Sequence, residues 1–189
     1  MLPLKEAIAE KHSLAEKMTF NQRMFNGELS KEEYILYLCQ QLAIFQAIER
    51  FDLPHTALVR CPKVFEDIKE LMELEDGKGL QIKPLVSTNE YQKYLHSLTQ
   101  EELLPHVYLN YLAIMFGGQM MKKNVPGSGK MYEFENQMEL VGSVRAFQKD
   151  EMGDEANKAL DYNIAILDEL QRVSESASNE VEVDGGESA

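Results

Sequence analysis

The stretch Tyr108–Lys123 constrains the fold more than any other part of the sequence. It reads YLNYLAIMFGGQMMKK, a strongly apolar helical segment that the pair Gly117 and Gly118 interrupts before Gln119–Lys123. Glycine inside a helix costs roughly 1 kcal/mol per residue relative to alanine, so the pair needs a local reason. Either another helix approaches closely, or the helix bends so that its backbone lies against a flat ligand. From these residues alone, a packing kink in a buried helix is the simpler explanation.

The rest of the chain also favours helices. Hydrophobic residues make up 44% of its 189 residues, and only 6 prolines and 11 glycines interrupt it. Ser30–Glu33 and Thr99–Glu102 match the capping-box pattern of helix N-termini, and no segment alternates convincingly as a strand does. These features predict an all-α protein with one helical domain over residues 1–173. The polar residues 174–189 are expected to form a disordered acidic tail.

Charge and cysteine content narrow the classes of function. The formal net charge is −13, and the last sixteen residues carry five acids and no base. Nucleic acid is not an expected ligand, because phosphate contacts rely on clustered Lys and Arg, whereas a partner with a basic surface is compatible. Cys39 and Cys61 form no C-x-x-C pattern and are expected to be reduced thiols. No apolar run reaches the ~18 residues of a membrane span, so we predict a soluble cytoplasmic protein.

His12 is the residue whose chemical role has the most alternatives. It lies beside the apolar stripe of a helix predicted from about Pro3 to Lys17, and the adjoining edge of that stripe holds Lys5, Ala9, His12 and Glu16. Such a histidine is either hydrogen-bonded at the edge of the core, which is the commoner case, or a metal ligand in an apolar cleft. A single histidine with an apolar pocket is the ligand set of haem, whose porphyrin supplies the other four donors.

Lys5 also has two interpretations. It lies two helical turns before His12, on nearly the same side of the helix. It is either an ordinary solvated lysine, which is the commoner case, or the partner of an anionic group at the rim of a pocket, such as a propionate.

Three segments resemble the haem oxygenase family. His106–Gln119 is similar to the distal-helix signature H-x-Y-x-R-Y-L-G-D-L-S-G-G-Q, and Leu4–Ala7 followed by His12 resembles the proximal helix. Gly129–Phe134 is similar to the segment that follows the distal helix, especially in cyanobacterial and marine phage versions. The segments come in the family's order, and the likeness extends from Leu4 to about Arg172.

The resemblance implies a helical bundle in which haem b lies between a proximal helix and a kinked distal helix. His12 would be the axial iron ligand, Gly117 and Gly118 would let the distal helix lie close over the macrocycle, and Lys5 and Tyr108 would meet propionates. The implied reaction uses haem as substrate and cofactor and opens its ring with oxygen and electrons, releasing biliverdin, iron and carbon monoxide. Reduced ferredoxin or a reductase would supply the electrons, and a bilin reductase acting downstream is a further candidate partner.

The chain departs from the family pattern on the distal helix. Ile114 stands where the family has an aspartate that organises a water, and Asn110, Ala113 and Phe116 replace its arginine, glycine and serine. Isoleucine cannot hold water by hydrogen bonds. Either Asn110 or a backbone carbonyl at the bend orders the water, or the activity is altered or lost.

Three hypotheses follow: an active haem oxygenase, a haem carrier or sensor impaired in ring opening, and a protein of the same fold that binds another small molecule or acts as a scaffold. The residues that the resemblance places at the site are, on the catalytic side, Gly117, Gly118, Asn110, Ala113 and Ile114, and for binding haem, His12, Lys5, Ala9, Glu16, Tyr108, Phe116, Arg145, Lys149 and Asn163.

Overall fold

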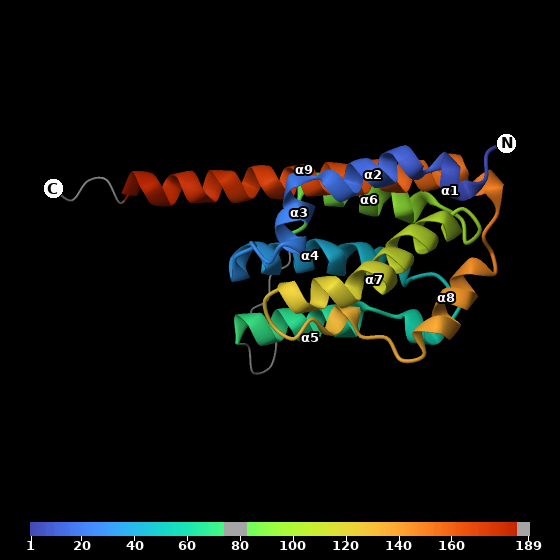
Figure 1. Cartoon of the computed structure of the whole chain (residues 1–189), viewed down its shortest axis with the longest axis horizontal. Coiled ribbons are helices and arrows are strands. Elements are labelled where there is room, and N and C mark those ends of the chain that lie inside the picture. The colour runs from blue at the N-terminus through green and yellow to red at the C-terminus, as the bar shows by residue number, and fades with distance from the viewer. Residues whose placement is uncertain (74–82, 185–189) are drawn as a thin grey trace.

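The computed structural model describes residues 1–73 and 83–184, and all regular structure in these ranges is helical (Figure 1). The α-helices are α1 Leu4–Ala7, α2 Ala9–Lys17, α3 Thr19–Phe25, α4 Lys31–Ile48, α5 Cys61–Met72, α6 Val86–Ser97, α7 Leu104–Asn124, α8 Gln137–Arg145 and α9 Gly153–Asp184. Short 3-10 helices are η1 Thr56–Leu58, η2 Lys130–Tyr132 and η3 Asp150–Met152. The prediction of a single all-α domain is confirmed.

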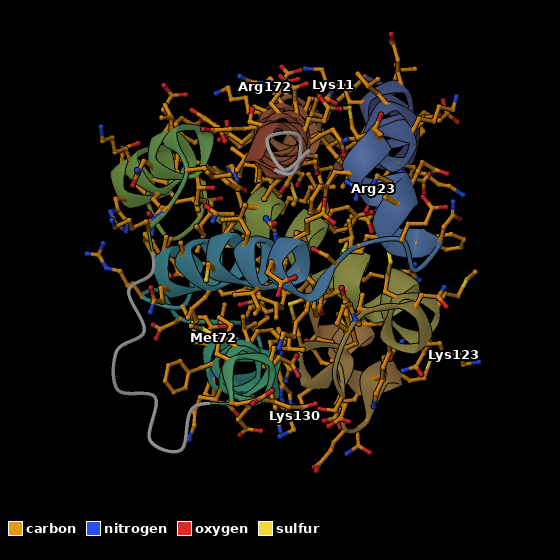
Figure 2. All side chains as sticks on the ribbon, turned by 90° about the vertical axis from the view of Figure 1, so that its left-hand side faces the viewer. Lys11, Arg23, Met72, Lys123, Lys130 and Arg172 are labelled. Carbon is orange, nitrogen blue, oxygen red and sulfur yellow. The ribbon has the colours of Figure 1, made fainter. Side chains whose placement is uncertain are left out.

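The long helix α9 is the support on which most of the other helices pack. Helices α2, α3, α6 and α7 all contact it. Viewed along the long axis, α6 and the α2–α3 pair lie on opposite sides of α9, and α4 lies between α9 and α5 (Figure 2). Their buried apolar side chains form one hydrophobic core. None of the described helices is both long enough and apolar enough to cross a membrane.

Both predicted capping boxes form. The Ser30 hydroxyl accepts a bond from the Glu33 backbone N–H at 3.1 Å, and the Glu33 carboxylate accepts from the Ser30 N–H at 2.8 Å. This pair starts α4, where such a cap contributes about 1 kcal/mol. The Thr99–Glu102 pair makes the same reciprocal bonds, at 2.8 Å and 3.3 Å, but it closes a turn that precedes α7.

Two helices near the N-terminus and the site differ from their predicted extents. The predicted helix Pro3–Lys17 is divided at Ile8, but Ile8 keeps right-handed dihedrals and accepts a bond from the His12 N–H at 2.9 Å, so α1 and α2 continue one another. The sequence also predicts a helix over Phe134–Asp150, and the observed helix is shorter, since α8 covers Gln137–Arg145. Asn136 before it has φ +53°, a left-handed conformation that cannot continue a right-handed helix.

The C-terminal segment also differs from its prediction. A disordered tail was expected from residue 174, but α9 remains helical to Asp184. Ser174 is buried, and its hydroxyl donates to the Leu170 carbonyl at 2.9 Å, so packing on the bundle extends past the predicted boundary. Gln171 donates to Glu175 across the next turn at 2.9 Å. Residues 185–189 of the predicted tail lie outside the described residues.

Candidate functional site

The first part of the site is the exposed side of α1 and α2. Leu4 and Ile8 are buried, whereas the predicted edge Lys5, Ala9, His12 and Glu16 is exposed. Side chains from the other end of the sequence hold this helix in place: Asn157 donates to the Ala7 carbonyl at 3.0 Å, and Asp150 accepts from the Leu4 N–H at 2.9 Å.

The His12 imidazole has one close polar neighbour. Its Nδ1 lies 3.6 Å from a carboxylate oxygen of Glu16, one turn later on the same helix, and half of the His12 side chain is exposed. Within the described residues no hydrogen bond joins it to a neighbouring helix, so the interpretation of a core-edge histidine has no support. With Nδ1 facing a carboxylate, Nε2 is the nitrogen left free to bind a metal.

The second part of the site is one face of α7, here called the front face, formed by Ala113, Phe116, Gly117 and Met120. Phe116 and Met120 are 55% and 54% exposed, although they are large apolar residues. The helix is not broken at the glycines as predicted, because α7 runs without interruption from Leu104 to Asn124. Figure 1 shows that it nevertheless changes direction along its length.

The two glycines have different surroundings. A Cβ atom on Gly118 would lie 2.8 Å from the ring of Tyr132, whereas a Cβ atom on Gly117 would have no neighbour within 4 Å. Close approach, one of the two predicted reasons for the pair, therefore explains Gly118, although the neighbour is a side chain of η2. No packing contact explains Gly117. It lies on the front face with Ala113, where a flat ligand would meet bare backbone.

Tyr132 is held against Gly118 by a buried carboxylate. Asp67 of α5 accepts bonds from the N–H groups of Lys130 and Met131, both at 2.8 Å, and so fixes the turn that leads into Tyr132. Burial raises the pKa of Asp67, and these two hydrogen bonds act in the opposite direction. The close contact at Gly118 is thus set by three segments: α5, η2 and α7.

The half of α7 that precedes the front face, here called the buried half, carries a buried polar chain that includes Asn110. The Asn110 amide donates to the Tyr91 hydroxyl at 3.1 Å and to the His106 carbonyl at 2.8 Å. The Tyr91 hydroxyl lies 2.8 Å from Nδ1 of His106, and Nε2 lies 3.1 Å from Glu155. The Glu155 carboxylate only accepts, so Nε2–H donates to it, and Nδ1 of the neutral ring accepts from the Tyr91 hydroxyl, which in turn accepts a hydrogen bond from Asn110.

The charged group of this hydrogen-bonded series lies at its outer end, at Glu155. His106 is fully buried, and burial lowers its pKa, while Glu155 acts to raise it. Burial also acts to raise the pKa of Glu155, but hydrogen bonds from Lys158, Tyr94 and His106 bring it below the ordinary value. Sequence reasoning missed Glu155, Tyr91 and Tyr94, because His106 finds its carboxylate 49 residues away in another helix.

Ile114, at the position where the resemblance implies an aspartate, is buried, with 7% of its surface exposed. It therefore packs in the core and brings no polar group to the front face. Asn163 of α9 is half-buried, and its amide donates to the Ala159 carbonyl of its own helix at 3.0 Å.

Basic residues from three segments border the two exposed faces. The guanidinium of Arg145, at the end of α8, lies 5.3 Å from the centre of the Phe116 ring. Burial raises the pKa of Tyr108, and the charge of Arg145 opposes that rise. Lys5 and Lys149 are exposed neighbours of Leu4 and Asp150, whose hydrogen bond brings them to the same end of the molecule.

Comparison with known proteins gives a consistent result. The sequence model of the "Heme oxygenase" family matches residues 2–177. The chain is 26% identical to heme oxygenase 2 of Macaca fascicularis over 220 residues, covering 96% of this chain and 68% of that protein. The structure of heme oxygenase-1 from Synechocystis sp. PCC6803 in complex with heme superposes with a TM-score of 0.79 at 21% identity, covering 96% of both chains. That of the Leptospira interrogans enzyme gives 0.73 at 23% identity, covering 88% of this chain and 97% of the other. The chain belongs to the haem oxygenase family.

Proposed function

We propose that this protein binds haem b between α2 and α7 and opens its ring with dioxygen, releasing biliverdin, iron and carbon monoxide. The observation that carries the proposal is the pairing of two exposed surfaces on α9. One presents His12 with a free Nε2, and the other presents Gly117 with open space above its backbone. Both α2 and α7 pack against α9, so the same helix supports the two surfaces.

The residues present fit haem in size and charge. The macrocycle is flat and apolar, and the two helices offer small residues to it, with Ala9 and Ala113 exposed and Gly117 half-buried. The two propionates need cations, and Lys5, Arg145 and Lys149 are exposed and make no ion pair with the described residues. Bound haem supplies the iron that activates dioxygen and the ring that is opened. His12 would hold the iron through Nε2, with Glu16 orienting the ring through Nδ1.

Asn110 takes the role of ordering water that the resemblance assigns to an aspartate. Its amide nitrogen is occupied by Tyr91 and the His106 carbonyl, while its side-chain oxygen accepts no bond from a described residue. That oxygen accepts a hydrogen bond from water but carries no charge and takes up no proton. Asn110 would therefore position a water as an aspartate does without changing the charge of the site.

Reduced ferredoxin is the electron donor that we propose, with a reductase as the alternative. A bilin reductase that takes up the product is a further candidate partner, and a cytoplasmic location remains a prediction. The acidic balance of the chain, 32 acids against 19 bases, favours a donor that presents basic groups at its docking surface.

The test is reconstitution with hemin under anaerobic conditions, followed by aerobic turnover. Wild-type protein should give a shifted Soret band that His12→Ala alters, and reduced ferredoxin with its reductase and catalase should then yield biliverdin on chromatography. His96→Ala, a change at an exposed histidine of α6, is the matched control and should behave as wild type. A protein that leaves the hemin spectrum unchanged, or a His12→Ala variant with the wild-type spectrum, would exclude this site.

A haem carrier that does not open the ring is the second candidate, favoured by the buried apolar Ile114. Ile114→Asp distinguishes the two candidates. If wild-type protein retains intact haem or stops at verdohaem during turnover and only the aspartate variant produces biliverdin, the wild type is a carrier. If wild type produces biliverdin at a comparable rate, Asn110 is sufficient.

A further inference from the structure

Phe116 occupies an unusual position for a large aromatic residue. It is 55% exposed on the front face of α7, next to Gly117. The guanidinium of Arg145 lies over its ring, 5.3 Å from the centroid. This distance lies within the ~6 Å range in which a cation is attracted to the face of an aromatic ring.

The helix that carries Arg145 is anchored on the same part of α7. Gln137, the first residue of α8, donates to the Met115 carbonyl at 2.8 Å, immediately before Phe116. Arg145, the last residue of α8, then lies over the ring of Phe116. One end of α8 is thus fixed by a hydrogen bond, and the other contacts α7 through an arginine above an aromatic ring.

Arg145 has a charge without a partner in a chain that is rich in carboxylates. It is exposed and pairs with no acid among the described residues, whereas Arg172 and Arg23 pair with Asp168 and Glu33. An arginine held by its face over a ring keeps its N–H edge free, and that edge matches the two oxygens of a carboxylate.

We propose that Phe116 is a positioning residue that holds Arg145 at the α8 edge of the site, where the guanidinium pairs with one carboxylate of the bound tetrapyrrole. The inference rests on the proposed function and deepens it. A pairing at one edge fixes how the macrocycle is rotated in its own plane. Phe116, through Arg145, therefore limits which ring position faces Asn110.

The first experiment compares the dissociation constants of hemin and hemin dimethyl ester, which lacks the carboxylate charges. Wild type should prefer hemin. Arg145→Gln should weaken hemin binding about tenfold and leave the ester unaffected, since a charged hydrogen bond is lost. Phe116→Ala should weaken hemin about threefold, the double variant should match Arg145→Gln alone, and Phe116→Tyr should retain wild-type affinity. Arg172→Gln is the matched control and should change neither constant.

Two readouts in NMR separate this inference from the proposed function. In the hemin-free protein, Phe116→Ala should remove the ring-current shift of the Arg145 side-chain protons. In the hemin complex, the same variant should show a second set of haem methyl resonances, from a second in-plane orientation. An unchanged Arg145 shift, or additive losses in the double variant, would overturn the inference while hemin binding by wild type left the proposed function standing. Failure of wild type to bind hemin would overturn both.

Discussion

The buried half and the front face of α7 differ in what surrounds their side chains. In the buried half, both ring nitrogens of His106 and the amide nitrogen of Asn110 have a partner at hydrogen-bond distance. On the front face, Phe116 and Met120 are exposed, and a Cβ atom on the half-buried Gly117 would meet no packing neighbour within 4 Å. The buried half is held by contacts within the protein, whereas the front face leaves large apolar side chains in water.

The difference can be expressed as a free energy of burying apolar surface. Phe116 and Met120 each leave about half of a large apolar surface in water, and covering the remainder would contribute roughly 1 kcal/mol per side chain. Single exposed apolar residues are ordinary, but two on one face beside a bare glycine form a patch of the kind that marks a ligand-binding surface. The buried half offers no such surface, since His106 and Asn110 are covered by neighbouring helices.

The largest expected effect on stability comes from removing the imidazole at the centre of the polar chain in the buried half of α7. His106→Ala should lower the free energy of unfolding by about 3 kcal/mol, because it leaves a cavity and deprives the Tyr91 hydroxyl and the Glu155 carboxylate of a partner. Urea denaturation followed by circular dichroism measures the loss. His96→Ala on the exposed side of α6 should stay within about 0.5 kcal/mol of wild type. Equal losses in the two variants would mean that the buried chain contributes nothing.

A smaller effect is expected at Gly118. In Gly118→Ala the new methyl group would lie 2.8 Å from the Tyr132 ring, so Tyr132 or α7 must shift. Overpacking costs roughly 1–3 kcal/mol and the helix propensity of alanine returns about 1, which leaves a net loss of up to about 2 kcal/mol. Gly142→Ala on α8, with open space around its Cβ position, is the matched control and should be neutral or stabilising. A stabilised Gly118→Ala would show that Tyr132 is not closely packed.

Sequence reasoning reached the fold and the front face for specific reasons. The capping box at Ser30 and Glu33 is local, so the sequence alone predicts the start of α4. Gly117 could be singled out because glycine is unfavourable inside a helix, and the exposed edge of α1–α2 follows from the spacing of Lys5, Ala9, His12 and Glu16.

The remainder depends on contacts between distant segments. No local pattern shows that Glu155 would reach His106, or that Tyr132 would fill the space beside Gly118 but not beside Gly117. The end of α9 was also missed. Its composition is polar, but Ser174 is buried against the bundle, and packing of that kind is decided by tertiary structure.

The contribution of the buried half of α7 to stability should also depend on pH. The unfolded chain protonates His106 near pH 6.5, whereas the folded protein, in which burial lowers this pKa, resists protonation until a lower pH. Between these two values the unfolded state binds more protons, so stability should fall as the pH falls, by at most about 1.4 kcal/mol per pH unit. Glu155 and Lys158 face the same group, with Tyr91 and Tyr94 from α6. His106→Gln should remove this dependence between pH 7.5 and 5.5 in denaturation curves, and a slope unchanged by the substitution would assign it to another group.

The smallest effect on folding should come from Gly117, and it sharpens the comparison most. Gly117→Ala places a methyl group in open space and improves helix propensity, so it should raise the free energy of unfolding by up to about 1 kcal/mol. The same methyl group would stand where the proposed site places the macrocycle, so hemin affinity should fall about tenfold or more, since interiors tolerate little extra volume. Gly142→Ala should show the gain in stability without the loss in affinity. A Gly117→Ala protein that bound hemin as wild type does would leave the front face without its ligand, because the bare backbone would then have no function that a methyl group disturbs.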